Sequence, residues 1–393
     1  MKHRSAASIV AALLSCLALA GCGGGAETKT GSGGTGSPIA PEAITVAGTL
    51  SALGPEQAAG ITLQGTGATV ALNEVGGRSL SDLRLGMPVD GVAQGTSQSS
   101  IASPTNLVAQ SLVRGPIVGY TAANRLLQFP GFGVLIDLNT ILEGVSEAEL
   151  LPGRTVEVFA QPSRQPTQWY ATRIAARPDS AGVTEFQGTI FSSDATSLTL
   201  TTNLRVQTQM ASVSTTTVLG GPGSITPSLI QGRHIRLRGN YDGASNTFTA
   251  TQVIAGFDAP RPDNQLHAIE GEVTSVVGPG HFLIQDLEIK TSLPVTNVTV
   301  GSFVRLRGRK LAGAVQAVEL AVLQRSAPVE YGVTGDITQI PTPQTIVARG
   351  EAVRTTGATF INGTAADLAV GRRVQMTLRV DNGALVAREI RFL

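Results

Sequence analysis

The sequence predicts an all-β protein made of five small closed barrels in tandem, behind a secretory signal and a flexible tether. Its 46 glycines, with only 15% charged and 4% aromatic residues, suit short strands joined by many turns. A strand start with the pattern apolar-x-Gly-x-apolar recurs, with its glycine at positions 48, 119, 188, 271 and 335. A strand–turn–strand segment recurs with it, most clearly as GRRVQMTLRVDNGALVAREI at 371–390. Two signatures at near-regular spacing indicate a repeat.

The first 21 residues have the pattern of a secretory signal. Lys2 and Arg4 precede an apolar run of about 15 residues, which is too short to span a bilayer comfortably. The run ends in LAGC, residues 19–22, which resembles the bacterial lipoprotein box. The resemblance implies that Cys22 is lipid-modified and becomes the new N-terminus; the alternative is an ordinary signal with an incidental cysteine.

Gly23, and not an aspartate, follows the lipidation box. In the enterobacterial sorting pattern, the absence of aspartate there favours export to the outer membrane. We therefore expect a lipid-anchored cell-envelope protein, at the outer membrane and on its periplasmic or surface face, with the membrane as a partner through the N-terminal lipid. Residues 22–43 comprise the lipidated cysteine and a Gly/Ser-rich tether, of which residues 23–40 are expected to behave as a flexible coil with a reach of about 20–25 Å.

The five repeats are expected at 44–113, 114–179, 180–260, 261–328 and 329–393. Each contains a first strand with a mid-strand glycine, two further strand segments, a one-turn segment, and a hairpin of strands four and five. A glycine inside a strand marks a bulge or a sharp bend, which the first strand of a small barrel needs in order to pair on both sides. This order describes an OB-like, five-stranded Greek-key barrel, plugged at one end by the one-turn segment.

The mid-strand glycines, the segment FINGTAADLAVGRRV at 360–374 and the closing LVAREI resemble a family of bacterial OB-like tandem repeats of unknown function, common in proteobacterial lipoproteins. The resemblance extends over about residues 44–393 and is strongest in the last three copies. Since that family has no assigned activity, it implies no catalytic residue.

The fourth strand of each repeat is expected to alternate between the barrel interior and solvent. The inward positions are Val89, Val156, Ile235, Val304 and Val374. The positions expected to face solvent include Asp90, Glu157, Phe159, Arg236, Arg238, Arg305, Arg307, Gln375 and Thr377.

Two sets of these arginines lead to different expectations. In the fourth repeat, Glu270 and Glu272 of the first strand are expected to pair with Arg305 and Arg307. In the third repeat, Gln187 and Thr189 occupy the corresponding first-strand positions. The sequence therefore predicts no acidic partner there. That leaves a basic patch of His234, Arg236 and Arg238 as the candidate site for an anionic ligand, such as a lipid headgroup phosphate or an acidic polysaccharide.

The sequence contains no recognised catalytic, phosphate-binding or metal-binding motif. The chain lacks a phosphate-binding GxxxxGK[ST] loop, HExxH, GxSxG and a cysteine cluster, so we expect no enzyme, no catalytic residue, no cofactor and no metal. His267 and His281 would need Asp286 or Glu288 to complete a metal site, at a spacing that matches no recognised pattern. The carboxylates Glu143, Glu147 and Glu149 resemble the solvated face of a helical turn.

Nucleic acid is not expected as a partner. The formal net charge is +1, which produces no field that draws the whole protein to polyanions. The second and third strands, where OB folds bind single strands, have few aromatic residues to stack on bases. Trp169 and Tyr170, at the hairpin of the second repeat, are either a recognition tip or a cover for the barrel end.

Three functional hypotheses follow. The first is a structural or interaction scaffold of unknown molecular function, with other envelope proteins or anionic glycans as partners. The second is a lipoprotein that binds an anionic polysaccharide or a lipid headgroup. The third, an enzyme with a site between repeats, has no motif to support it.

Overall fold

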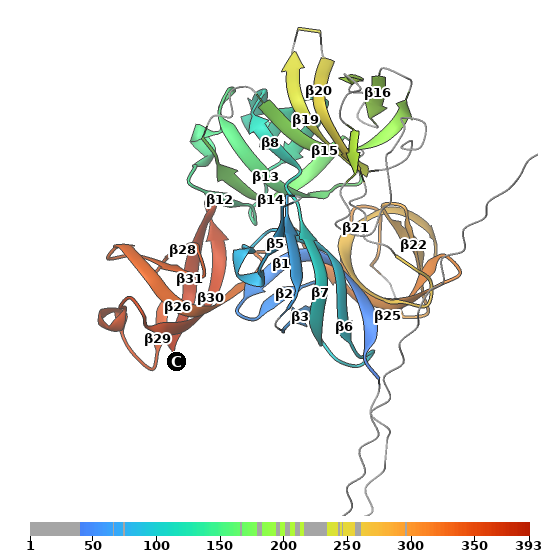
Figure 1. The fold of residues 1–393 in the computed structure, drawn as a ribbon. Helices are drawn as coiled ribbons and strands as arrows, with labels where there is room; N and C mark the ends of the chain where they lie inside the picture. The colour runs from blue at the N-terminus through green and yellow to red at the C-terminus, as the bar shows by residue number, and fades with distance from the viewer. Residues whose placement is uncertain are drawn as a thin grey trace, which may run out of the picture. The chain divides into compact units, whose positions relative to one another are not determined.

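The computed structural model describes residues 40–65, 67–73, 75–165, 167–178, 183–193, 197–200, 205–208, 213–215, 234–242, 244–245, 247–255, 261–294 and 297–393. Throughout these ranges the secondary structure consists of β-strands and short 3-10 helices (Figure 1). The all-β class predicted from the sequence is therefore confirmed. The expected signal, Cys22 and the tether up to residue 39 lie outside the described residues.

The strands fall into groups, here called barrels 1 to 5 in chain order. Barrel 1 contains β1 (Glu42–Leu53), β2 (Glu56–Ala58), β3 (Ile61–Leu63), β4 (Thr69–Leu72), β5 (Val75–Arg78), the 3-10 helix η1 (Leu80–Asp82), β6 (Pro88–Gly95) and β7 (Ile101–Ala109). Barrel 2 contains β8 (Val113–Pro116), β9 (Gly119–Thr121), η2 (Ala122–Asn124), β10 (Leu126–Phe129), β11 (Phe132–Leu135), β12 (Ile141–Glu143), η3 (Glu147–Glu149), β13 (Thr155–Pro162) and β14 (Gln168–Ala176).

The remaining three barrels have the same order of principal strands, although the described residues of barrels 3 and 4 contain no 3-10 helix of the kind expected as the one-turn segment. Barrel 3 contains β15 (Val183–Ser193), β16 (Ser197–Leu200), β17 (Arg205–Thr208), β18 (Val213–Thr215), β19 (His234–Asp242) and β20 (Thr247–Ala255). Barrel 4 contains β21 (Leu266–Gly278), β22 (His281–Ile284), β23 (Leu287–Thr291), β24 (Phe303–Leu311) and β25 (Ala314–Leu323). Barrel 5 contains β26 (Tyr331–Thr342), β27 (Thr345–Ala348), β28 (Glu351–Arg354), β29 (Thr359–Ile361), η5 (Ala365–Asp367), β30 (Arg373–Asp381) and β31 (Ala384–Phe392).

Strand pairing closes each group of described strands into a barrel. In barrel 1, β1 pairs with β2, β2 with β3, β3 runs parallel to β7, and β7 returns through β6 to β1. The same circuit closes barrel 2, where β8 and β9 share the role of the first strand. It also closes barrels 3, 4 and 5. The order first, second, third, fifth, fourth is that of the predicted OB-like barrel.

The mid-strand glycines allow the hairpin of strands two and three to cross close over the first strand. A Cβ at Gly48 would lie 2.9 Å from the Cβ of Ala59, and one at Gly335 would lie 2.7 Å from Cγ of Arg349. The strand pairing of β1, β21 and β26 shifts register just after the glycine. The predicted bend is therefore present, and its cause is this close approach.

The outward faces of the fourth strands differ from the prediction. The inward valines and Ile235 are buried as expected. However, four residues that were expected to face solvent are almost fully buried: Glu157 (4% exposed), Phe159 (1%), Arg236 (2%) and Arg307 (6%). The reason is that neighbouring barrels cover these faces. Phe159 of barrel 2, for example, belongs to the core cluster of barrel 1.

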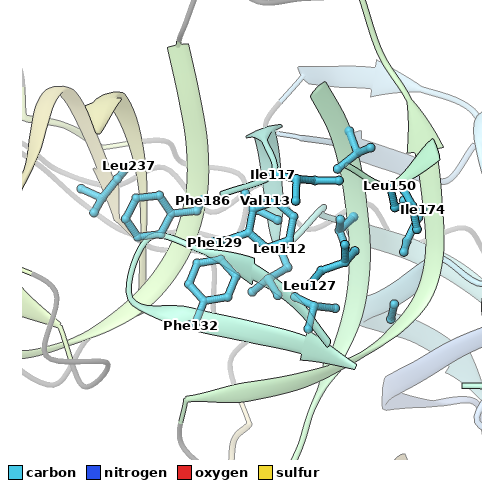
Figure 2. Close-up of a cluster of buried hydrophobic side chains, with 14 of the residues drawn as sticks. Leu112, Val113, Ile117, Leu127, Phe129, Phe132, Leu150, Ile174, Phe186 and Leu237 are labelled. Atoms are coloured by element: carbon cyan, nitrogen blue, oxygen red, sulfur yellow. The ribbon is translucent and has the colours of Figure 1, made fainter. Parts of the chain in front are cut away.

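Barrels far apart in the sequence are joined by their first strands. Residues 44–47 of β1 pair in parallel with 266–269 of β21, and 52–53 of β1 with 332–333 of β26. Barrels 1, 4 and 5 thus share one sheet, while β8 and β15 join barrels 2 and 3 in the other. Phe132 of barrel 2 lies 6.0 Å from Phe186 of barrel 3, ring to ring, within a common core (Figure 2).

Candidate functional site

The segment that connects barrels 4 and 5, residues 324–330 and here called the linker, is held by the side chain of Arg325. The guanidinium donates from Nη1 to Asp137 Oδ2 (3.0 Å) and from Nη2 to Gln161 Oε1 (2.8 Å). It also lies 3.8 Å from the centre of the Tyr170 ring, a favourable cation–π contact. All three partners belong to barrel 2, so Arg325 ties the linker to that barrel.

Asn139 of barrel 2 holds the backbone of the same linker. Its Nδ2 donates to the carbonyl oxygens of Arg325 and Ala327, both at 3.1 Å, and its Oδ1 accepts from the N–H of Val329 at 2.8 Å. The hydroxyl of Tyr331, at the start of β26, donates to the Asn139 carbonyl at 3.2 Å. One side chain thus satisfies three backbone groups that the linker itself cannot pair.

A cavity of about 340 Å³ lies beneath the linker. Its walls come from barrels 1, 2 and 4, from the linker and from Tyr331. A second cavity of about 260 Å³ is lined by barrels 1, 2 and 4 with Gln187 of barrel 3, and it includes Trp169. Gln161 and Glu270 line both cavities, so these two side chains separate them. The larger cavity is the candidate functional site.

Glu270 is the buried carboxylate of this site. Arg305 Nε and Nη2 each lie 3.1 Å from Glu270 Oε2, which confirms the predicted pair. Burial raises the pKa of Glu270, and the charge and hydrogen bond of Arg305 offset only part of that rise. A carboxylate with a raised pKa in a cavity wall is typical of functional sites, although structural ion pairs produce the same shift.

The second predicted pair, Arg307 with Glu272, is wrong. Arg307 Nη2 instead donates to the carbonyl of Thr96 in barrel 1 at 2.6 Å. Glu272 accepts the backbone N–H of Arg164 in barrel 2 at 3.2 Å. Both residues face neighbouring barrels, which offer partners that the ladder within barrel 4 does not contain.

A buried ion cluster joins barrels 1, 2 and 5. Arg173 of β14 and Glu351 of β28 are each 1% exposed, and Arg173 Nη1 lies 3.1 Å from Glu351 Oε2. Arg173 also donates to Glu143 at 2.8 Å and to the carbonyl of Leu85 at 3.0 Å, while the Leu85 N–H donates to Glu351 at 2.9 Å. Burial alone would lower the pKa of Arg173, but the charges of Glu351 and Glu143 outweigh it and raise that pKa.

The proposed basic patch of the third repeat is only partly open to solvent, because Arg238 is exposed but Arg236 is not. Arg236 is buried, and its Nη2 lies 3.1 Å from Glu185 Oε2. Arg238 Nε lies 3.5 Å from the other Glu185 oxygen. The prediction that these arginines have no acidic partner is therefore wrong, because Glu185, two residues before Gln187, faces Arg238 across the ladder. His234 pairs with Thr189 in the same ladder, and its side chain lies outside the described residues.

The remaining residues singled out from the sequence have structural partners. Trp169 packs edge-on against Phe132, with ring centres 5.1 Å apart, so it covers a core. Glu147 accepts the Tyr120 hydroxyl at 2.6 Å, and burial together with Glu147 raises the pKa of Tyr120 to about 12. Glu149 accepts the backbone N–H of Ser146 at 2.7 Å, as in a capping box. The sequence favours a solvated face for these carboxylates. The structure shows instead that each of them has a hydrogen-bond partner.

The two histidines whose side chains are described, His267 and His281, form no common site. His281 Nε2 lies 2.7 Å from Glu288, while His267 is buried between β1 and β24. Among the described residues, no group of three or more His, Cys, Asp or Glu side chains is placed to hold a metal ion. The described residues also contain no helix that is long and apolar enough to cross a membrane.

Comparison with protein-family models identifies two of these repeats. No curated protein matches the sequence. Among solved structures, "drosophila Unr CSD456" is matched over 53% of this chain and 97% of that chain, at 12% identity and a TM-score of 0.13. Residues 114–175 and 334–391 match the family model described as a domain of unknown function, DUF5666. Those segments lie in barrels 2 and 5, so two of the barrels have the pattern of a repeat family to which no function is assigned.

Proposed function

We propose that the protein is a lipid-anchored protein of the cell envelope, at the outer membrane, and that its barrels form one rigid, non-catalytic scaffold for other envelope proteins. The observation that carries this proposal is the direct bonding between barrels that are distant in the sequence. A flexible spacer needs no such bonds, because domains joined by linkers move independently unless their interface is large and specific. Fixed barrels hold their outer surfaces in a constant arrangement, which is what a scaffold must do.

Barrel 1 supports this role through its polar contacts with its neighbours. Glu42 of barrel 1 accepts from Arg309 of barrel 4 at 2.5 Å, and Glu56 of barrel 1 pairs with Arg349 of barrel 5. Thr49 of barrel 1 accepts from Gln161 of barrel 2 at 2.5 Å. The N-terminal barrel, the one nearest the expected anchor in the sequence, is thus also bonded to three others.

The anchor is supported by the LAGC box and by the apolar run before it. Replacing Cys22 with serine should move the protein from the membrane fraction to the soluble fraction. Two or three acyl chains, at about 0.8 kcal/mol per buried CH₂, hold a protein firmly on a bilayer, whereas a single chain holds it only marginally. Cell fractionation followed by immunoblotting of both fractions measures the change.

The matched control is Cys16→Ser, which alters the other cysteine of the chain inside the expected signal. This variant should remain with the membranes, since the lipid would still be attached at Cys22. If Cys22→Ser stays in the membrane fraction to the same extent as Cys16→Ser, the proposed anchor is incorrect.

A further inference from the structure

We propose that the cavity beneath the linker is a binding site for a small, uncharged, polyhydroxylated molecule of the size of a monosaccharide. The cavity holds about 340 Å³, near the lower end of the roughly 300–1,000 Å³ that ligand pockets occupy. That size suits a single sugar ring better than a long chain. The cavity is formed where several barrels meet. The contacts between the barrels would therefore create a binding site in addition to fixing their arrangement.

The charges in the cavity wall argue against an ionic ligand. Asp137 is paired with Arg325, and Glu270 is paired with Arg305. A charged ligand would therefore enter a space in which opposite charges already satisfy each other. Removing such a ligand from water costs more than the remaining attraction returns. A neutral ligand avoids that cost.

The same wall offers many places to accept a hydrogen bond. An ionised carboxylate has about four acceptor positions. Arg305 contacts only Oε2 of Glu270, whereas Asp137 accepts from Arg325 at Oδ2 and from the Asn139 N–H and the Thr140 hydroxyl at Oδ1. Thr49 and Ser51 also line the cavity. The Thr49 hydroxyl accepts from Gln161, and the Ser51 hydroxyl donates to the Gln57 carbonyl and keeps its acceptor positions. Acceptors of this kind match a ligand rich in hydroxyl donors, and charge-assisted hydrogen bonds to carboxylates are the stronger ones.

The rest of the wall is apolar and aromatic. Phe303, Tyr331, Leu50 and Leu323 contribute to the lining, and Tyr331 is almost fully buried. Ligand pockets characteristically combine such a lining with a few placed polar groups that fix the orientation of the ligand. A sugar ring presents an apolar C–H face and a rim of hydroxyls, so it fits both parts of the wall.

The test is calorimetric titration of the processed protein, solubilised in a detergent without a sugar headgroup, with glucose and N-acetylglucosamine as probes. Glucuronate and glucosamine serve as charged counterparts of similar size. For about a dozen heavy atoms, we expect dissociation constants on the order of millimolar or tighter for an uncharged probe. Weaker binding is expected for both charged probes.

Two neighbouring linker residues provide matched variants. Ala327 lines the cavity, whereas Ser326 is exposed and lies outside the lining. Ala327→Phe should fill the cavity and weaken binding at least about tenfold, since a clash excludes the ligand. Ser326→Phe should bind as the parent does. Thermal melts of both variants show whether each remains folded.

Three results would overturn the proposal. The first is no heat from either uncharged probe at concentrations far above millimolar. The second is tighter binding of glucuronate or glucosamine than of the uncharged sugars. The third is equal affinity in the two phenylalanine variants while both remain folded. None of these depends on where the protein is anchored, so they are distinguishable from a failure of the Cys22 experiment.

Discussion

Replacing Arg173 with leucine should lower the free energy of unfolding by about 3–5 kcal/mol, the largest loss that we expect from a single substitution. The change leaves the Glu351 carboxylate, 1% exposed, buried without its counter-charge, and removal of one partner of a buried pair typically costs this much. It also removes the donor to the Leu85 carbonyl. Urea unfolding followed by circular dichroism measures the loss.

A second arginine in barrel 2 supplies the control. Arg125 pairs with Glu147 at 2.6 Å, but both side chains are more than a third exposed. Because exposed ion pairs contribute at most about 1 kcal/mol, Arg125→Leu should cost far less than Arg173→Leu. The double variant Arg173→Met with Glu351→Leu should recover part of the loss, since it leaves no unpaired buried charge. Equal costs for Arg125→Leu and Arg173→Leu would show that the cluster is not buried in solution.

Acid should destabilise the protein through His267, which lies fully buried opposite Gly308 of β24 and Thr45 of β1. Burial, with smaller contributions from the charges of Arg261 and Lys310, lowers the pKa of His267 from 6.5 to about 4, and the Pro262 backbone offsets only part of that fall. The unfolded chain therefore takes up a proton below pH 6.5 that the folded protein resists. The contribution of neutral His267 to stability should be fully present above pH 6.5. The free energy of unfolding should fall by about 3 kcal/mol as the pH drops towards 4.

A substitution isolates this contribution. Burial raises the pKa values of Glu270 and Glu272, so protonation of these carboxylates favours the folded state and opposes the effect of His267. The contributions of Glu270 and Glu272 cancel when the free energies of unfolding of His267→Leu and of the parent are compared at the same pH. The variant should lose the histidine-dependent fall between pH 6.5 and 4, whereas His281→Leu, at a partly exposed position of the same barrel, should keep it. Parallel pH profiles for the parent and His267→Leu would contradict this account.

The barrels themselves were predictable because their signals are local. A mid-strand glycine recurs in each copy, a one-turn segment or a tight turn such as Asn382-Gly383 in several, and alternation fixes which side of a strand faces inward. Asn382 and Gly383 indeed have positive φ values of 48° and 78°, as a two-residue hairpin turn requires. None of these features depends on how one barrel meets another.

The contacts between barrels were not predictable, since they depend on which surfaces dock. Arg236 and Arg307 occupy outward positions of their own ladders, and nothing in those ladders indicates that another barrel covers them. One signal was present in the sequence: Phe159 is a large apolar residue at a position where most copies are polar. An outward phenylalanine indicates a covered face, and this one lies in the core of barrel 1.

The candidate site could not be predicted from the sequence for a related reason. Asn139, Arg325 and Ala327 lie between strands, where the repeat pattern is weakest, and they come from different repeats. Arg325 and Asn139 are 186 residues apart, and no spacing rule joins them. Glu270 and Arg305 were singled out beforehand, because their pairing lies within one barrel, and Tyr170, which contacts Arg325, was named only as part of an aromatic pair.

The central claim is that barrels 1 and 5, although three barrels separate them in the sequence, are joined directly through their first strands. A Cβ added at Gly332 would lie 3.3 Å from the Cβ of Ala52, close to the roughly 3.5–4.5 Å of a disulfide. Under mild oxidation, the Ala52→Cys, Gly332→Cys protein should therefore lose its free thiols rapidly within the monomer. A control pairs Ala52→Cys with Ala366→Cys, an exposed position of η5, and should keep its thiols. Titration of free thiols distinguishes the outcomes: rapid loss in the first protein alone is the predicted result, and persistence of the thiols in both, or equal loss in both, would contradict it.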